Sequence, residues 1–68
     1  MNIQVNGEIV SLEGPVTVTA LLAQQRVESP DMVAVQINGE FIEKESYADI
    51  MIENGAEVEF LYFMGGGA

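Results

Sequence analysis

Neither cysteine nor histidine occurs in this 68-residue sequence. The absence of cysteine excludes disulfides and thiol chemistry. The absence of histidine removes the usual acid–base residue at neutral pH and the commonest metal ligand in proteins. A Ser-His-Asp triad or a Cys-His pair therefore cannot be assembled, and we predict no conventional catalytic site.

Cationic side chains are almost as scarce. Only Arg26 and Lys44 oppose eleven aspartates and glutamates, which gives a net charge of −9. We expect no binding to nucleic acid or to anionic membranes, because their phosphates would repel the chain. A basic protein surface would attract it and speed the encounter. The alternative is that the charge only keeps a small protein soluble.

Long apolar runs are also missing. No run approaches the roughly 20 residues that span a bilayer, and the start "MNIQVNGEIV" has no basic n-region or apolar h-region of a signal peptide. We therefore expect a soluble, cytoplasmic protein. Hydrophobic residues make up 49% of the chain, which is enough to build the core of one small domain.

The carboxylates form two pairs with a spacing of two residues, Glu43 with Glu45 and Glu57 with Glu59. On a strand, this spacing places both members of a pair on one face, where they could act as an acid–base or metal-binding pair. The chain carries no metal-binding loop pattern. We favour a solvated strand face, and predict no metal site and no cofactor bound by the chain itself.

The first half of the sequence predicts a hairpin followed by a helix. Strands over 2–6 and 8–12 flank Asn6-Gly7, a dipeptide that suits a type I′ turn. Thr17 can cap the next element by accepting a backbone N–H bond. A helix over 18–26 follows from an apolar face at helical spacing, made by Val18, Leu21 and Leu22.

The second half predicts more strands and two further Asn-Gly turns. One strand carries Val33, Val35 and Ile37 on one face, and a short strand follows at Phe41 and Ile42. A single helical turn could pack Tyr47 and Ile50 against the core. The last strand, 57–63, has two faces: Val58, Phe60 and Tyr62 lie on one, and Glu57, Glu59, Leu61 and Phe63 lie on the other.

This order of elements predicts an α+β fold. One helix covers one face of a mixed sheet of about five strands, with the first and last strands as neighbours at its centre. That arrangement is the β-grasp, or ubiquitin-like, fold. We assign residues 1–64 to the domain and residues 65–68 to a flexible glycine-rich tail.

The tail consists of Gly65, Gly66, Gly67 and Ala68. Glycine has no Cβ and loses much entropy on ordering, so this segment makes a thin, mobile arm. Such an arm could enter a narrow channel in a partner and present a main-chain carboxylate there. A frayed terminus without function is the alternative, and a β-grasp domain directly before the glycines favours the arm.

Several stretches together resemble the ThiS/MoaD family of ubiquitin-like sulfur carriers. They are "MNIQVNGE", "VTVTALLA", "VAVQINGEFI" and "NGAEVEFLYFMGGG". The likeness covers essentially the whole chain, and the spacing of elements fits the ThiS members best. Asn-Gly alone is unspecific, but its combination with the terminal glycines is specific.

The resemblance implies a function in sulfur transfer in which the chain is not itself the enzyme. An E1-like enzyme, using ATP and Mg, adenylates the C-terminal glycine carboxylate. A persulfide or sulfide then displaces AMP to leave a thiocarboxylate. The carrier delivers this sulfur to an acceptor, either a thiazole synthase or an amino-acid sulfhydrylase that makes homocysteine or cysteine. The reactive glycine maps to Gly67.

Ala68 departs from the family pattern, because it follows the diglycine and leaves Gly67 without a free carboxylate. Either Ala68 is a cap that a JAMM-type zinc metalloprotease removes, or it is an artificial addition. We favour the cap, because tags rarely add a lone alanine. Capped carriers of this kind are associated more with sulfur amino acids than with thiamine.

Partner docking is expected beside the tail. Leu61 and Phe63 would form an apolar patch if the helix covers only the opposite face. Together with Met64 they would contact the partner enzymes, while Glu57 and Glu59 would meet basic residues. Alternatively, the loop around Tyr47 and Ile50 covers this patch. Two other functions stay open: a β-grasp interaction module with an inert tail, and a modifier that is conjugated to lysine.

Overall fold

The computed structural model describes residues 1–27 and 32–62, and these form seven strands and one α-helix. The strands are β1 (Asn2–Val5), β2 (Glu8–Ser11), β3 (Val16–Thr17), β4 (Val33–Ile37), β5 (Glu40–Ile42), β6 (Met51–Ile52) and β7 (Glu57–Tyr62). The helix is α1 (Val18–Gln24), and a short 3-10 turn, η2, spans Lys44–Ser46. No helix within the described ranges is long and apolar enough to span a membrane.

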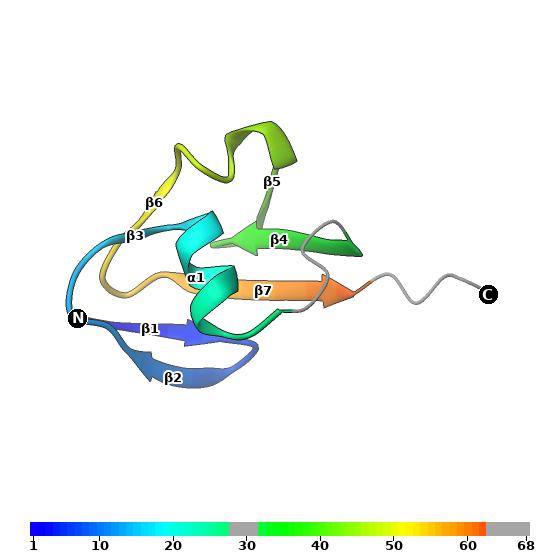
Figure 1. Ribbon diagram of the computed structural model, residues 1–68. Coiled ribbons are helices and arrows are strands. Elements are labelled where there is room, and N and C mark those ends of the chain that lie inside the picture. Colours follow the sequence, from blue (N-terminus) through cyan, green and yellow to red (C-terminus); the bar gives the residue numbers. More distant parts are fainter. Residues whose placement is uncertain (28–31, 63–68) are drawn as a thin grey trace.

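Five strands form the main sheet, in the order β2-β1-β7-β4-β5. β1 and β7 run parallel, and the other neighbours run antiparallel. α1 lies across one face of this sheet (Figure 1). The predicted β-grasp fold is therefore confirmed, including the pairing of the first strand with the last. Two chain segments far apart in sequence are thus brought together at the middle of the sheet.

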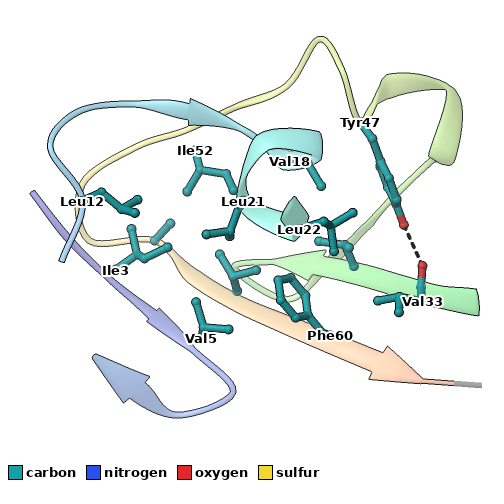
Figure 2. Close-up of a cluster of buried hydrophobic side chains, with 13 residues drawn as sticks. Ile3, Val5, Leu12, Val18, Leu21, Leu22, Val33, Tyr47, Ile52 and Phe60 are labelled. Atoms are coloured by element: carbon teal, nitrogen blue, oxygen red, sulfur yellow. Dashed lines mark hydrogen bonds between the residues drawn. The ribbon is translucent and has the colours of Figure 1, made fainter. Parts of the chain in front are cut away.

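The core lies between α1 and the sheet (Figure 2). Val18, Leu21 and Leu22 supply the apolar face of the helix and are buried. They pack with the inward residues of the sheet and of the loops, which are Ile3, Val5, Leu12, Val33, Val35, Tyr47, Ile52, Ala56, Val58 and Phe60. The period-2 alternation of the strands is what turns these residues to one side.

Helix α1 begins and ends for identifiable reasons. The Thr17 hydroxyl accepts a hydrogen bond from the Ala20 backbone N–H at 3.0 Å, as the sequence predicts. The helix is two residues shorter than the predicted 18–26. Arg26 adopts φ +59, a left-handed conformation that stops the helix, and its N–H bonds to the Ala23 carbonyl oxygen at 3.0 Å.

All three predicted Asn-Gly turns are present. Asn6-Gly7 and Asn38-Gly39 have positive φ at both residues, as a type I′ hairpin requires, with values of 52 and 86 and of 51 and 87 degrees. At Asn54-Gly55 only the glycine is positive, with φ +85. This third turn instead joins β6 to β7, with the Ala56 N–H bonded to the Glu53 oxygen at 3.1 Å.

The segment before β6 packs much as predicted. Tyr47 follows the η2 turn and is buried, and Ile50 is half-buried against the core. The Tyr47 hydroxyl donates to the Val33 carbonyl oxygen at 3.2 Å (Figure 2). The pairing of β5 with β4 reaches only Val35. The Val33 carbonyl therefore has no partner in β5, and the Tyr47 hydroxyl bonds it instead.

The sequence did not predict a second, two-stranded sheet. β3 and β6 pair antiparallel, with Val16 opposite Ile52 and Thr17 opposite Met51. Each strand has two residues, which is too short for a hydrophobic period to be recognised. This small sheet places the Ile52 side chain in the core beside α1.

Candidate functional site

The two faces of β7 differ as the alternation predicts. Val58 and Phe60 are buried beneath α1, whereas Glu57 and Glu59 are exposed on the uncovered side of the sheet. Leu61 shares that uncovered side and is 40% exposed. An apolar side chain therefore lies at the surface two residues before Phe63, where docking is expected.

Tyr62 differs from the expectation for its face. By alternation it lies on the same side as Val58 and Phe60, yet it is 53% exposed. β1 pairs with β7 only as far as Val58. Among the described residues, no strand pairs with the last residues of β7 along the edge where β1 lies. Less of the molecule therefore surrounds the Tyr62 side chain than surrounds Val58 and Phe60.

Phe41, an exposed aromatic residue, lies on the same uncovered face as Leu61. The register pairs Leu61 with Ala34, Glu59 with Gln36, and Gln36 with Phe41. Paired residues point to the same face, so we define the outer patch as Ala34, Gln36, Phe41, Glu57, Glu59 and Leu61. Phe41 is 64% exposed. The patch combines two large apolar side chains with two carboxylates.

The sequence analysis did not assign Phe41 to the surface, although the hairpin turn before it carries the necessary information. A two-residue Asn38-Gly39 turn fixes the hairpin register, which puts Phe41 opposite Gln36 and away from the inward residues Val35 and Ile37. Counting outward from the turn would have assigned Phe41 to the same face as Leu61 once β4 was placed beside β7.

The loop around Tyr47 and Ile50, which was the alternative cover for this face, does not lie on it. The loop around Tyr47 and Ile50 packs against the start of α1, where the Val18 N–H bonds the Ile50 oxygen at 3.2 Å and the Thr19 N–H bonds the Tyr47 oxygen at 3.1 Å. That loop lies on the helix side of the sheet. The alternative that it covers Leu61 is therefore wrong, and the outer patch is accessible.

The turn after β1 holds β7 near its end. The Asn6 backbone N–H donates to the Val58 oxygen at 2.9 Å, and the Asn6 Oδ1 accepts from the Phe60 N–H at 2.9 Å. On its other edge β7 is paired with β4 through Tyr62, which lies opposite Val33. The position and direction of β7 are fixed by both contacts just before the predicted tail.

The two predicted glutamate pairs lie in different kinds of secondary structure. Glu57 and Glu59 share one exposed strand face, as predicted. Glu43 and Glu45 do not lie in a strand: Glu43 precedes η2 and Glu45 is inside it. Across residues 1–27 and 32–62, no group of three or more histidine, cysteine, aspartate or glutamate side chains could hold a metal ion.

The remaining predicted site residues lie outside the described residues. They are Phe63, Met64, Gly65, Gly66, Gly67 and Ala68. The structure therefore gives the surface from which the tail departs.

Comparisons with known proteins agree on one family. The model of the ThiS family matches residues 2–67. The crystal structure of a thiamine biosynthesis protein (ThiS) from Geobacter metallireducens superposes with a TM-score of 0.87 and 42% sequence identity, over 98% of this chain and 100% of that chain. A solution NMR structure of a thiamine biosynthesis protein from the same organism gives a TM-score of 0.80 and 41% identity, over 100% of this chain and 90% of that chain.

A longer protein also matches along the whole chain. The thiazole synthase of Paramagnetospirillum magneticum is 38% identical over 68 residues, which is 100% of this chain and 21% of that protein. The chain thus spans about a fifth of the length of this curated relative.

Proposed function

The chain belongs to the ThiS family, and from this premise we propose that it carries sulfur, as a thiocarboxylate on Gly67, for the synthesis of the thiazole of thiamine. Members of the family are small sulfur carriers that work with partner enzymes. The predictions of a ThiS-type carrier and of a protein that is not itself an enzyme are confirmed by this membership.

One observation carries the assignment of Gly67. The family match ends at residue 67, one residue before Ala68, which supports Gly67 as the position of the family's terminal glycine. In the proposed reaction, a Gly67 carboxylate oxygen attacks the α-phosphorus of ATP on the E1-like enzyme, and pyrophosphate leaves. Sulfide then attacks the carbonyl carbon of the acyl adenylate and AMP leaves, so one sulfur replaces one oxygen. The ATP and Mg belong to that enzyme.

Ala68 has a direct consequence for this chemistry. A peptide bond joins Gly67 to Ala68, so Gly67 has no carboxylate until this bond is hydrolysed. We propose that a JAMM-type zinc metalloprotease performs this cleavage. Adenylation would then depend on prior trimming, which makes the protease a third partner.

The thiazole synthase relative supports the destination of the sulfur. A protein of that name contains a stretch similar to this entire chain, which links sequences of this type to thiazole synthesis. Both solved relatives are thiamine biosynthesis proteins by name. We therefore propose a thiazole synthase as acceptor. An amino-acid sulfhydrylase, which the Ala68 cap favours, is the alternative to be tested beside it.

The outer patch supplies the proposed docking surface. Phe41 and Leu61 offer exposed apolar contact, and Glu57 and Glu59 offer charge for basic residues of the partner. Phe63 and Met64 directly follow β7 in sequence and are proposed to extend the contact. Docking at this surface would direct the glycine-rich tail toward the active site of the partner enzyme.

Intact mass spectrometry tests the carrier chemistry. The chain ending at Gly67, the full chain, and the full chain treated with the zinc protease are each incubated with the E1-like enzyme, ATP, Mg and sulfide. The first and third should gain the mass of one sulfur in place of one oxygen, and the second should not change. An unmodified Gly67 form would refute the carrier, and ladders of lysine-linked adducts would establish the modifier instead.

The acceptor is identified by adding the thiocarboxylate form to each candidate enzyme with its other substrates. Loss of the sulfur, seen as reversion to the carboxylate mass, is expected with the thiazole synthase and not with the sulfhydrylase. The reverse outcome would assign the chain to sulfur amino-acid synthesis.

A further inference from the structure

The backbone groups of β7 alternate between its two neighbours. On the β1 side, the oxygens of Ala56 and Val58 accept from Gln4 and Asn6 at 2.9 Å, and the Phe60 N–H is bonded by the Asn6 Oδ1. On the β4 side, the Glu57 oxygen accepts from the Asn38 N–H at 2.7 Å. Even-numbered residues of β7 therefore direct their N–H and C=O toward β1, and odd-numbered residues direct theirs toward β4.

This alternation leaves one short stretch of β7 that no described strand pairs on the β1 side. The Tyr62 N–H and C=O point to the β1 side, as does the Phe60 C=O. β1 ends at Val5, and Asn6 turns the chain away with φ +52. Within residues 1–27 and 32–62, the strands that neighbour β7 are β1 and β4 alone. The Asn6 side chain satisfies the Phe60 N–H, so the open edge begins immediately after it.

We propose that the E1-like adenylating enzyme adds an extended main-chain segment to this open edge, bonding the Phe60 C=O and the Tyr62 N–H and C=O. The inference rests on the function proposed above. It makes the end of β7 a site of strand addition, in which main-chain bonds give affinity and adjacent side chains give specificity. Asn6 defines the limit of the added strand.

The length of chain beyond Tyr62 argues for this occupant. Gly67 is five residues further on, a reach of at most about 17–18 Å at 3.3–3.6 Å per residue. The enzyme must therefore enclose the chain soon after Tyr62 to place the Gly67 carboxylate at its nucleotide. Gly65, Gly66 and Gly67 have no side chains to be recognised, so backbone bonds to the end of β7, together with the Phe63 and Met64 side chains, would set the register of the tail.

The edge also adjoins the outer patch. Leu61, between Phe60 and Tyr62, points to the uncovered face and bonds toward β4, where its partner is Ala34. A partner seated on Leu61 would thus lie beside the open edge of the neighbouring residues. An edge of two to three residues is short enough to avoid the general strand pairing that long exposed edges invite.

Amide hydrogen exchange tests the inference directly. In the free protein, trimmed to Gly67, the Tyr62 amide should exchange far faster than the Leu61 amide, which faces β4. In the complex with the adenylating enzyme, Tyr62 exchange should slow by about tenfold or more, the equivalent of one new hydrogen bond. A complex in which the Tyr62 amide still exchanges at its free rate would overturn the proposal.

A pair of variants separates backbone bonding from side-chain burial. Tyr62→Pro removes the N–H that faces the open edge, and Tyr62→Ala removes the side chain but keeps that N–H. Kd for the adenylating enzyme should be about tenfold higher for the proline variant than for the alanine variant. Both should keep the thermal midpoint of the parent, since neither removes a bond to β4.

Equal Kd values for the two variants, with Gly67 still adenylated, would refute strand addition and leave the carrier function standing. Absence of adenylation and of any complex with the parent chain would refute both. The two failures are therefore distinguishable.

Discussion

At the scale of single residues, the asparagine of each Asn-Gly turn has a second role beyond the turn. Its Oδ1 accepts a hydrogen bond from a strand distant in sequence: Asn6 from Phe60 at 2.9 Å, Asn38 from Glu57 at 2.9 Å, and Asn54 from Asn2 at 2.8 Å. The three side chains thus fasten strand ends where no ladder bond is available. An Asn-Gly pattern predicts the turn, but the acceptor role depends on which strand lies opposite.

The two type I′ turns allow a matched comparison of this second role. Asn6→Gly and Asn38→Gly both keep a residue that tolerates positive φ, and both lose one bond to a β7 N–H. The Phe60 N–H is partly buried and the Glu57 N–H is exposed, so water replaces the second bond more readily than the first. Asn6→Gly should lower the free energy of unfolding by about 1–3 kcal/mol, and Asn38→Gly by less than about 1 kcal/mol.

Urea unfolding followed by circular dichroism measures both losses, with the parent chain as reference. Equal losses for the two variants would show that burial of the bonded N–H does not decide the cost. A larger loss for Asn38→Gly would contradict the argument outright.

At the scale of elements, the register of β5, β4 and β7 builds the outer patch. β7 alone presents Leu61 and the two glutamates, and the Asn38-Gly39 hairpin brings Phe41 to the same face. The opposite edge strand, β2, also exposes an apolar residue on that face, because Ile9 pairs with Gln4 and is 71% exposed. Ile9 therefore serves as a matched control position on the same face of the sheet, two strands away from β7.

Substitutions on these edge positions test the docking surface. Phe41→Ser and Leu61→Ser should each raise Kd for the adenylating enzyme by about fivefold or more, because each removes apolar contact area from the interface. Ile9→Ser should leave Kd unchanged. Exposed positions contribute little to folding, so all three variants should unfold within about 1 kcal/mol of the parent.

Isothermal titration calorimetry gives the Kd values, and urea unfolding gives the stabilities. If Ile9→Ser weakens binding as much as Leu61→Ser, the interface covers the whole sheet face rather than the outer patch. Unchanged binding for both Phe41→Ser and Leu61→Ser would refute docking at the patch.

At the scale of the whole molecule, the net charge of −9 is spread over a domain whose radius of gyration is 11.6 Å over Cα atoms. So small a body presents a negative potential to any partner, and a basic surface would be steered toward it. Glu57 and Glu59 place part of this charge within the outer patch. Charge and docking surface therefore coincide.

The association rate should accordingly fall with salt. Raising NaCl from about 50 to about 500 mM should lower the rate constant for binding the adenylating enzyme by about tenfold, because screening removes the long-range attraction. Glu57→Gln/Glu59→Gln should reduce this dependence more than the control Glu8→Gln/Glu13→Gln. Stopped-flow fluorescence measures the rates. A rate independent of salt would indicate that the charge serves only solubility.

The sequence alone determined the local structure and the family. Three Asn-Gly pairs fixed three turns, alternation identified the buried face of β7 through Phe60, and the apolar spacing of Val18, Leu21 and Leu22 identified the helix. These signals are local, because each depends on residues within one turn or one strand. The resemblance added the carrier function, which family membership confirms.

Only the tertiary structure decided what joins these elements. Three features link residues whose distance in sequence carries no periodic signal. They are the pairing of β3 with β6, the placement of β4 beside β7 that brings Phe41 to the same face as Leu61, and the bond from Phe60 to Asn6. The end of β1 at Val5, four residues short of the end of β7 in the parallel register, likewise emerges only once the two strands are paired. Strand order and register create the open edge at Tyr62, because a backbone group is free or bonded according to which strand lies beside it.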